Sequence, residues 1–386
     1  MSDVLHIDAT RTASVTDAMR SVFVELLVHG PMSRAEVARR LDLSPSALTK
    51  LTKPLLENGY LREQPVETRN TVGRPSLPLT VDASRAQFVG IKLTADELFG
   101  VRTDLSATVQ SETRLSLPNH DVEAIVEQIA TAVRQLSDPG HRIAGLGLSL
   151  AGVVFPGDPV VHASPFLGWR DVPLADLVRD RTGLPVVLDN DVRALTAAQH
   201  WFGAGVGQRS FALITVGAGI GCGLVINDRL ATGHSRATGL IGHLVIDDHG
   251  PLCEQGHRGC ARAYATSTAV RRSIRSALDR PDLTFEDCLA LARDGNIVAR
   301  RVIDDAGRAL GQVVATVANL TGPDVVILSG EAITMINIGD AAFHASLDQH
   351  THWTAAPVPV VIRPFAFNEW ARGAAVAALQ YQVMGE

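Results

Sequence analysis

The sequence predicts an α/β protein with a small helical module at its N-terminus. Between residues 33 and 81, two short helices joined by a tight turn precede two short strands. From residue 87 onward, buried strands alternate with amphipathic helices, as in α/β folds. The chain has 386 residues, enough for two or three domains with separate cores. We expect a flexible arm over residues 1–14, a winged helix-turn-helix over 15–82 and an α/β body over 87–386.

Composition places the chain among globular proteins of a reducing compartment. The first residues are polar and no window approaches eighteen uninterrupted apolar residues, which supports neither a signal peptide nor a membrane partner. The four cysteines are too few and too scattered for a disulfide framework, so we expect a cytoplasmic protein. A net charge of −6 argues against a chain that coats nucleic acid with its whole surface, but it allows one basic module.

The N-terminal module has the start signals of two helices. Ser33 is placed to cap a helix over residues 34–41, with Glu36 available for the reciprocal capping bond. Ser44 is placed to cap a second helix that starts at Pro45 and ends at Asn58-Gly59. The second helix of such a pair enters the major groove. The residues of this helix and its cap that we expect at the DNA are Ser44, Ser46, Thr49, Lys50 and Lys53.

Two strands over residues 60–63 and 77–81 flank a segment that would form the wing. The wing carries Arg69 and Arg74, and the extended Gly-Arg-Pro sequence around Arg74 suits a narrow minor groove. Residues 30–80 contain eight basic and five acidic side chains, a net charge of +3. We therefore expect double-stranded operator DNA as a partner. The alternative is an all-helical interaction module with a solvated polar face.

Polar residues follow a buried strand over residues 185–188. Asn190 and Asp191 stand at its carboxyl end, where ligands bind in α/β folds. A carboxylate there can accept from a hydroxyl group or act as a general base. The alternative is that Asp191 caps the helix over 192–202. Further along, the glycine-rich stretch Gly217–Gly223 predicts either a loop that holds phosphate through backbone N–H groups or a simple hairpin turn.

Cys253 and Cys260 bracket a glycine-containing turn, and His243 lies ten positions before the first of them. These side chains suit a tetrahedral zinc site closed by a distant imidazole. The alternative is a pair of ordinary core cysteines beside a surface histidine.

Taken together, these stretches resemble the ROK family of repressors, open reading frames and kinases, and specifically its winged-helix repressors of sugar metabolism. The resemblance covers nearly the whole chain and implies an actin-like, two-lobed sugar-kinase fold of the ribonuclease H type. It also implies a sugar site between the lobes and assembly as a homodimer or homotetramer. The stretches that carry it are Gly73-Arg74-Pro75, Gly145 to Gly152, Leu167-Gly168-Trp169 before Pro173-Leu174, Asn190-Asp191, Gly217 to Gly221, Gly242-His243, Cys253 to Cys260 and Ala371 to Ala375.

The first hairpin of the body departs from the family's kinases. Those kinases have an aspartate followed by a Gly-Gly-Thr phosphate loop, where this chain has Lys92 to Asp96. A lysine in place of the acid, and side chains in place of glycines, remove the close approach that a triphosphate needs. We therefore expect no ATP and no kinase activity. Asp191 matches the family's catalytic base and is expected to be a hydroxyl acceptor or a relic.

The sugar site departs as well, because Leu240 and Arg262 stand where the family has glutamates, and Phe166 where it often has asparagine. This favours a changed ligand, such as a phosphosugar attracted by Arg262, or a sensor that has lost its sugar. The residues expected to contact a sugar or sugar-phosphate effector are Asn190, Asp191, His243 and Arg262.

The metal site lacks the family's middle cysteine, which is Gln255 here. Glutamine is a poor zinc ligand, so His257 is the nearest candidate for the fourth position. The expected zinc ligands are His243, Cys253, Cys260 and His257.

The sequence as a whole predicts a transcriptional regulator, a repressor of carbohydrate metabolism, with a degenerate kinase-like sensor. The alternatives are a sugar kinase with an appended DNA-binding domain and a DNA-binding regulator that needs no ligand.

Overall fold

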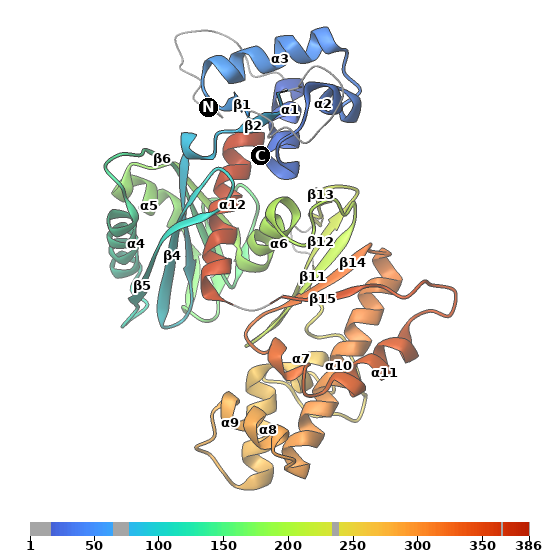
Figure 1. Ribbon diagram of the computed structural model, residues 1–386. Coiled ribbons are helices and arrows are strands. Elements are labelled where there is room, and N and C mark those ends of the chain that lie inside the picture. The colour runs from blue at the N-terminus through green and yellow to red at the C-terminus, as the bar shows by residue number, and fades with distance from the viewer. Residues whose placement is uncertain (1–16, 65–76, 234–238, 364–365, 386) are drawn as a thin grey trace. The chain divides into compact units, whose positions relative to one another are not determined.

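The computed structural model describes the chain over residues 17–64, 77–233, 239–363 and 366–385 (Figure 1). The chain forms two compact units, Met1–Gly207 with Phe367–Glu386, and Gln208–Ala366. The expected N-terminal arm and the hairpin segment with Arg69 and Arg74 lie outside the described residues. None of the helices in the described ranges is long and apolar enough to cross a membrane.

The first unit begins with three helices and a two-stranded antiparallel sheet. The helices are α1 (Asp17–His29), α2 (Arg34–Arg40) and α3 (Pro45–Glu57), and the strands are β1 (Leu61–Glu63) and β2 (Leu79–Val81). These bounds agree closely with the prediction. The side chains of this module share one hydrophobic core, which includes Phe23, Leu26, Leu48, Leu55 and Leu79.

The caps of α2 and α3 are the predicted serines. The Ser33 hydroxyl accepts from the backbone N–H of Glu36, and the Ser44 hydroxyl accepts from that of Ala47. The reciprocal bond expected from Glu36 is not formed. Its carboxylate instead accepts from the guanidinium groups of Arg39 and Arg40, one helical turn along. The Glu36 carboxylate therefore pairs with two cations of its own helix.

A five-stranded sheet forms the centre of the first unit, in the order β10-β6-β3-β4-β5. Its first three strands along the chain form an antiparallel meander, and β6 and β10 run parallel to β3. Figure 1 shows α4 and α5 on one side of this sheet and α12 on the other. The bounds are β3 (Gln87–Leu93), β4 (Glu97–Asp104), β5 (Val109–Ser116), β6 (Ile143–Leu150), β10 (Val186–Asn190), α4 (Val122–Leu136), α5 (Leu174–Thr182), α6 (Asp191–Phe202) and α12 (Phe367–Met384).

Short elements complete the first unit. A 3-10 turn, η1 (Ala83–Arg85), leads from β2 into β3, and a small antiparallel sheet follows β6. Its strands are β7 (Val153–Val154), β8 (Val161–Ser164) and β9 (Trp169–Val172).

Two glycines let α12 lie directly on the central sheet. A Cβ atom at Gly147 of β6 would come within 1.8 Å of the Ala374 carbonyl oxygen, and one at Gly90 of β3 within 1.9 Å of the Ala371 carbonyl oxygen. No side-chain rotation can relieve an overlap with backbone atoms, so the helix itself would have to move. The close contact therefore fixes glycine at both positions.

We expect Gly147→Ala to destabilise the first unit by about 2–4 kcal/mol, because α12 must move away from the sheet and lose packing. The measurement is the urea midpoint of the purified chain. Gly140→Ala in an exposed turn is the control, since its Cβ would have no neighbour closer than 3.6 Å. Equal midpoints for the two variants would contradict this account of the packing.

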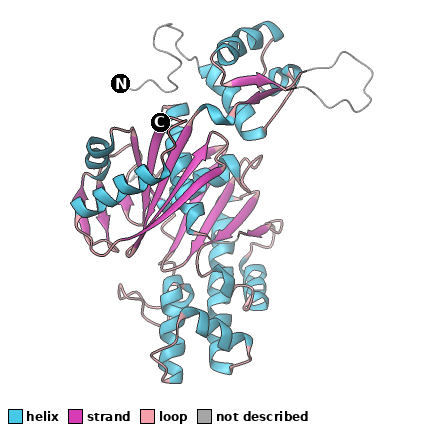
Figure 2. Ribbon diagram, turned by 60° about the vertical axis from the view of Figure 1, so that its left-hand side comes forward, coloured by secondary structure: helices cyan, strands magenta, loops and turns pink. Residues whose placement is uncertain are grey.

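The second unit repeats the strand arrangement of the first. Its sheet has the order β13-β12-β11-β14-β15, with an antiparallel meander followed by two strands parallel to the first. Figure 2 draws the strands of the chain in magenta. The strands are β11 (Phe211–Val216), β12 (Ile220–Ile226), β13 (Arg229–Leu230), β14 (Val325–Ser329) and β15 (Val360–Ile362). One sheet pattern therefore occurs twice in the chain.

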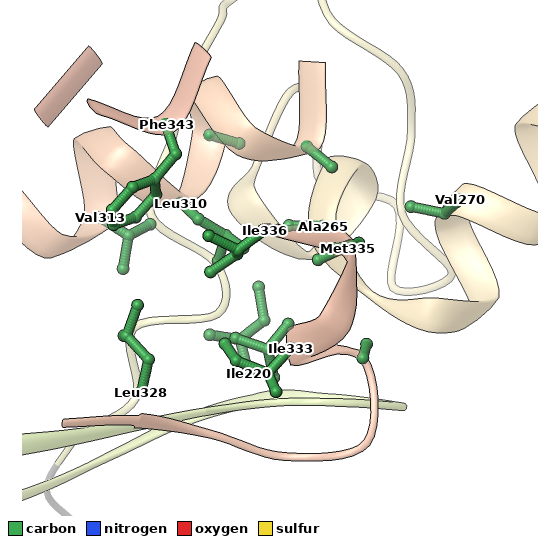
Figure 3. Close-up of a cluster of buried hydrophobic side chains, with 14 of the residues drawn as sticks. Ile220, Ala265, Val270, Leu310, Val313, Leu328, Ile333, Met335, Ile336 and Phe343 are labelled. Carbon is green, nitrogen blue, oxygen red and sulfur yellow. The ribbon is translucent and has the colours of Figure 1, made fainter. Parts of the chain in front are cut away.

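Helices cover this second sheet and enclose its core. Figure 3 shows side chains from the sheet, such as Ile220 and Leu328, facing Val313, Ile333 and Phe343 from the covering elements. These elements are α7 (Ala261–Ala265), α8 (Ser267–Leu278), α9 (Phe285–Arg293), α10 (Ile297–Thr321), η2 (Ile333–Met335) and α11 (Asp340–His350). Helices α7 and α8 are separated at Thr266, whose extended backbone ends α7 and whose hydroxyl caps α8.

Candidate functional sites

Helix α3 presents a polar surface beside a buried face. Leu48, Thr52 and Leu55 are buried, while the predicted DNA-facing residues are exposed. The exposed set is Ser44, Ser46, Thr49, Lys50 and Lys53. The hydroxyl of Thr49 donates to the Pro45 carbonyl, and Lys53 lies 3.8 Å from Glu57. The ammonium of Lys50 has no carboxylate partner among the described residues and stays free for a ligand.

The module's cations divide into paired and unpaired groups. Arg34 contacts Glu63, and Arg40 contacts both Glu25 and Glu36, so these cations are neutralised within the module. Arg62 on β1 is exposed, and no described carboxylate pairs with it. Arg62 contributes to the charge of +3 over residues 30–80, but it is not one of the residues predicted to contact DNA.

In the first unit, Lys92 and Asp191 form a buried ion pair. Lys92 lies near the C-terminal end of the central strand β3, and Asp191 is the first residue of α6, beyond the end of β10. The Lys92 Nζ donates to the Asp191 Oδ2, and the two residues are only 5% and 7% exposed. The ammonium also lies 5.1 Å from the ring centroid of Trp370. The carboxylate that matches the family's base is therefore held by a cation of its own chain.

The side chains of Asn190 and Asp189, which adjoin Asp191 in the sequence, also form hydrogen bonds within the chain. The Asn190 side chain caps α6 by accepting from the backbone N–H groups of Val192 and Arg193, and its amide donates to the Gly152 carbonyl at 3.1 Å. The alternative that Asp191 caps this helix is wrong, because Asn190 holds that position. The buried Asp189 accepts from Arg193 at 3.1 Å, and burial raises the pKa of Asp189 to about 6.

In the second unit, the segment from His243 to Cys260 folds into a compact knuckle. The backbone N–H of Cys253 donates to the His257 carbonyl, which closes the turn between the two residues. Gly259 has a φ of +61°, and a Cβ there would come within 1.5 Å of the Asp247 carbonyl oxygen. Only glycine fits this position. The turn places Cys260 beside Cys253, where the two cysteines share one small core.

The knuckle brings the predicted metal ligands together. The ligand atoms of His243, Cys253 and Cys260 lie within 4.8 Å of one another. The His243 Nδ1 is 3.9 Å from the Cys253 Sγ and 3.6 Å from the Cys260 Sγ. The His257 Nδ1 is 3.7 Å from the Cys253 Sγ and 2.8 Å from the His243 Nδ1.

The distances among His243, Cys253 and Cys260 fit three ligands of a tetrahedral zinc site. Zinc bond lengths imply about 3.6 Å between a sulfur and a nitrogen ligand and about 3.3 Å between two nitrogens. The three sulfur–nitrogen distances above agree with this value, but His257 is not part of the mutually close group and its imidazole would have to move away from that of His243 to become the fourth ligand. Burial lowers the pKa of His243, assisted by the nearby His257 and Arg262. A neutral imidazole is the form that binds a metal.

The cation that was expected to attract an anionic effector is already paired. The Arg262 Nε donates to the Glu254 carboxylate, within the knuckle region. Leu240 is 82% exposed. Its side chain has no hydrogen-bond acceptor, and the guanidinium of Arg262 is a donor only.

The glycine-rich stretch after β11 forms a tight hairpin turn rather than an open loop. The backbone N–H of Gly217 donates to the Gly219 carbonyl, and β12 pairs directly with β11. The N–H of Ala218 donates to the Glu331 carboxylate at 2.7 Å. That carboxylate lies against Gly217, where an added Cβ would meet its oxygen at 2.8 Å. A carboxylate of the chain itself thus takes a donor that could have held phosphate.

The chain is similar to known proteins over most of its length. A model of the ROK family matches residues 88–380. The chain belongs to the ROK family. It is 26% identical to the transcriptional dual regulator NagC of Escherichia coli over 315 residues, which are 78% of this chain and 77% of that protein. It is 29% identical to a putative xylose repressor of a Caldicellulosiruptor species over 80% of this chain and 82% of that protein.

Two solved structures match different shares of the chain. The crystal structure of a ROK family transcriptional regulator, a homologue of the E. coli Mlc protein, covers 97% of this ROK chain with a TM-score of 0.78 and 25% identity, and all of that chain is matched. A ROK family glucokinase from Streptomyces griseus covers 76% of this chain and is also fully matched, with a TM-score of 0.66 and 26% identity.

Two contacts at these sites were not foreseen from the sequence. A lysine inside a buried strand requires a counter-charge, and this rule applied to Lys92 would have pointed to a nearby acid such as Asp191. Glu331 follows the buried strand β14, so its side chain stands at a strand end, the usual place for a functional group. No local signal linked it to the turn at Ala218.

Proposed function

We propose that this ROK protein is a cytoplasmic transcriptional repressor of carbohydrate metabolism that binds operator DNA through a winged helix-turn-helix. In this proposal α3 enters the major groove, and the strands β1 and β2 form the base of the wing. The protein acts as a homodimer or homotetramer, because operator half-sites are read by symmetry-related helices.

The observation that carries this proposal is the extent of the structural match. The ROK regulator corresponds to nearly the whole chain, whereas the glucokinase corresponds to about three quarters of it. The family model begins at residue 88, after the module that contains α1, α2 and α3. Lys50 on α3 and Arg62 on β1 are exposed, have no carboxylate partner among the described residues, and would supply positive charge for DNA binding.

Three features support a body without kinase activity. The ammonium of Lys92 holds Asp191, so this carboxylate is not free to take a proton from a sugar hydroxyl. Lys92 also stands where the family's kinases have an acid. In the second unit, Glu331 binds the N–H of Ala218 and places negative charge where a phosphate would need donors.

The body would respond to a sugar or sugar-phosphate effector. The relatives named above are a regulator of the NagC type and a xylose repressor, and the knuckle keeps His243. Its Nδ1 faces the cysteines, which leaves Nε2 on the opposite side of the ring for an effector hydroxyl. Arg262, in the same unit, would join such a site only if its partner Glu254 were displaced.

A structural zinc ion would close the knuckle through His243, Cys253, Cys260 and His257. We expect about one zinc per chain after purification under metal-replete conditions, measured by mass spectrometry of the metal content. Cys260→Ser should lose most of the zinc and His257→Ala should retain less than the wild-type chain. Cys222→Ala, at a buried cysteine of β12 outside the knuckle, is the matched control and should keep it. A wild-type content below about half an equivalent would instead indicate a packed knuckle without metal.

A regulator that needs no ligand is the second candidate. The pairs Lys92–Asp191 and Arg262–Glu254 favour it, because they occupy groups that a sugar would use. It shares the DNA-binding step with the first proposal and differs only in the absence of an effector.

Selection of genomic DNA fragments on the purified full chain tests the proposal. We expect enrichment of a sequence with two related half-sites about one helical turn, or a multiple of it, apart. A parallel assay with ATP and a panel of sugars should show no turnover above background. A chain that enriches no sequence but phosphorylates a sugar would establish the kinase alternative.

A further inference from the structure

Helix α8 carries three arginines that no described carboxylate pairs with directly. They are Arg271, Arg272 and Arg275, on adjacent turns of the helix. The Arg272 Nη2 donates to the Leu252 carbonyl at 3.2 Å, and the Arg275 Nε donates to the Leu283 carbonyl at 2.6 Å. These neutral acceptors orient the guanidinium groups without cancelling their charge.

Two acidic residues close to these arginines form ion pairs with other arginines. Glu254, close to Arg272, pairs with Arg262, and Asp282, close to Arg275, pairs with Arg280. One lining residue is acidic, Asp279, at the C-terminal edge of the helix. The face of α8 therefore keeps a net positive charge in a chain whose net charge is −6.

The arginines line a groove with small-molecule dimensions. Its volume is about 530 Å³, within the range of ligand sites. Thr268 and Ser276 add hydroxyl groups to the same helix face, three or four residues from the arginines. Ala269, Val270 and Ile274 on the opposite face are buried, so the position of the helix is fixed by its core side and the groove is left open.

Ordinary helix electrostatics explain only part of this arrangement. A cation in the last turn stabilises the negative end of the helix, which accounts for Arg275. The helix dipole does not account for Arg271 and Arg272. Each lies three or four residues before Arg275 on the same helix, where like charges repel each other. An anion between the guanidinium groups would remove this repulsion.

We propose that the groove on α8 binds a phosphate-bearing small molecule. Guanidinium groups match phosphate oxygens with paired hydrogen bonds, and the hydroxyls of Thr268 and Ser276 supply further donors. An acidic protein segment fits less well, because the groove lines one face of a twelve-residue helix and lacks a large apolar anchor. None of the groove's residues is a proposed zinc ligand or effector residue, so the inference goes beyond the proposed function, and Arg272 contacts the knuckle through the Leu252 carbonyl.

Titration of inorganic pyrophosphate into the full chain by calorimetry, at constant ionic strength, tests this site. We expect saturable binding of one pyrophosphate per chain. Arg271→Gln should weaken it at least about fivefold, because a guanidinium that would pair with the phosphate is lost. The fold should be kept, since the Arg271 side chain makes no hydrogen bond to the described residues. Arg271→Gln/Arg272→Gln should weaken pyrophosphate binding further. Arg300→Gln is the matched control, since Arg300 lies on α10 and is paired with Asp304.

Zinc content is measured in each sample, because pyrophosphate can remove a metal from the knuckle. Removal of zinc to the same extent from the wild-type and Arg271→Gln chains, with equal heats, would overturn the proposal. So would the absence of saturable binding, or binding of a polyglutamate peptide where pyrophosphate does not bind. Unchanged circular dichroism of Arg271→Gln ensures that a loss of binding reflects the missing guanidinium.

Discussion

Lys92→Met is expected to destabilise the first unit by about 3–5 kcal/mol. The substitution removes the cation and leaves the Asp191 carboxylate buried without its partner. Desolvation of an unpaired charge costs far more than the lost packing of a lysine stem, and methionine fills most of that volume. The same reasoning predicts a comparable loss for Asp191→Asn, which leaves the ammonium alone.

The double variant Lys92→Met/Asp191→Asn distinguishes this explanation from a packing effect. With both charges removed, we expect stability within about 1–2 kcal/mol of the wild-type chain. Lys53→Met is the control, because Lys53 is an exposed lysine with a distant partner, and it should change stability by less than about 0.5 kcal/mol.

Urea unfolding followed by tryptophan fluorescence measures these effects. Three of the four tryptophans, Trp169, Trp201 and Trp370, belong to the first unit, so the signal reports mainly on its unfolding. A double variant as unstable as Lys92→Met would contradict the ion-pair account and would indicate that the lysine acts through its shape.

Lys50→Glu is expected to reduce operator affinity by about 100-fold in a dimer, since each half-site would lose about 1.4 kcal/mol. Lys50 is exposed on α3 and has no partner in the described parts of the chain, so its charge is available to DNA. For the same reason, the substitution should leave the unfolding midpoint unchanged. Fluorescence anisotropy with a labelled operator, at one fixed salt concentration, measures the affinity.

The control for this variant is Arg170→Glu, which makes the same change of charge at an exposed position of β9 in the body. It should bind the operator nearly as well as the wild-type chain. If both variants lose affinity equally, the effect comes from the overall charge of the protein and α3 is not the recognition helix. A salt titration of Lys50→Ala adds detail, because loss of a phosphate contact lowers the salt slope by about one.

The sequence predicted those elements whose apolar residues follow a clear period. Helices α3 and α6 and strand β10 have buried apolar residues, and their observed bounds are close to the predicted ones. Strand β5 was missed because only Val109 and Leu115 of its residues are apolar. Helix α11 was missed for a similar reason, since it buries little more than Phe343 and Leu347.

The sequence contains the candidate site residues but not their contacts. The knuckle was recognisable because its residues are close in sequence, and the structure groups His243, Cys253 and Cys260 within 4.8 Å of one another. The partners Lys92 and Asp191 are 99 positions apart and meet only through the order of strands in the sheet. The Glu331 contact with Ala218 spans 113 positions and likewise depends on two neighbouring strands. Local patterns do not contain such pairings, because the topology of the sheet creates them.

Coupling between effector and operator tests the central claim most directly. Sugars and sugar phosphates are first ranked by the rise in melting temperature of the full chain, and the operator affinity is then measured with and without the best of them. Because coupling between two ligands is reciprocal, we predict that this compound weakens operator binding at least about fivefold and that operator DNA weakens the compound's binding by the same factor. An operator affinity that no stabilising sugar or sugar phosphate changes would contradict the account and would establish a regulator that needs no ligand.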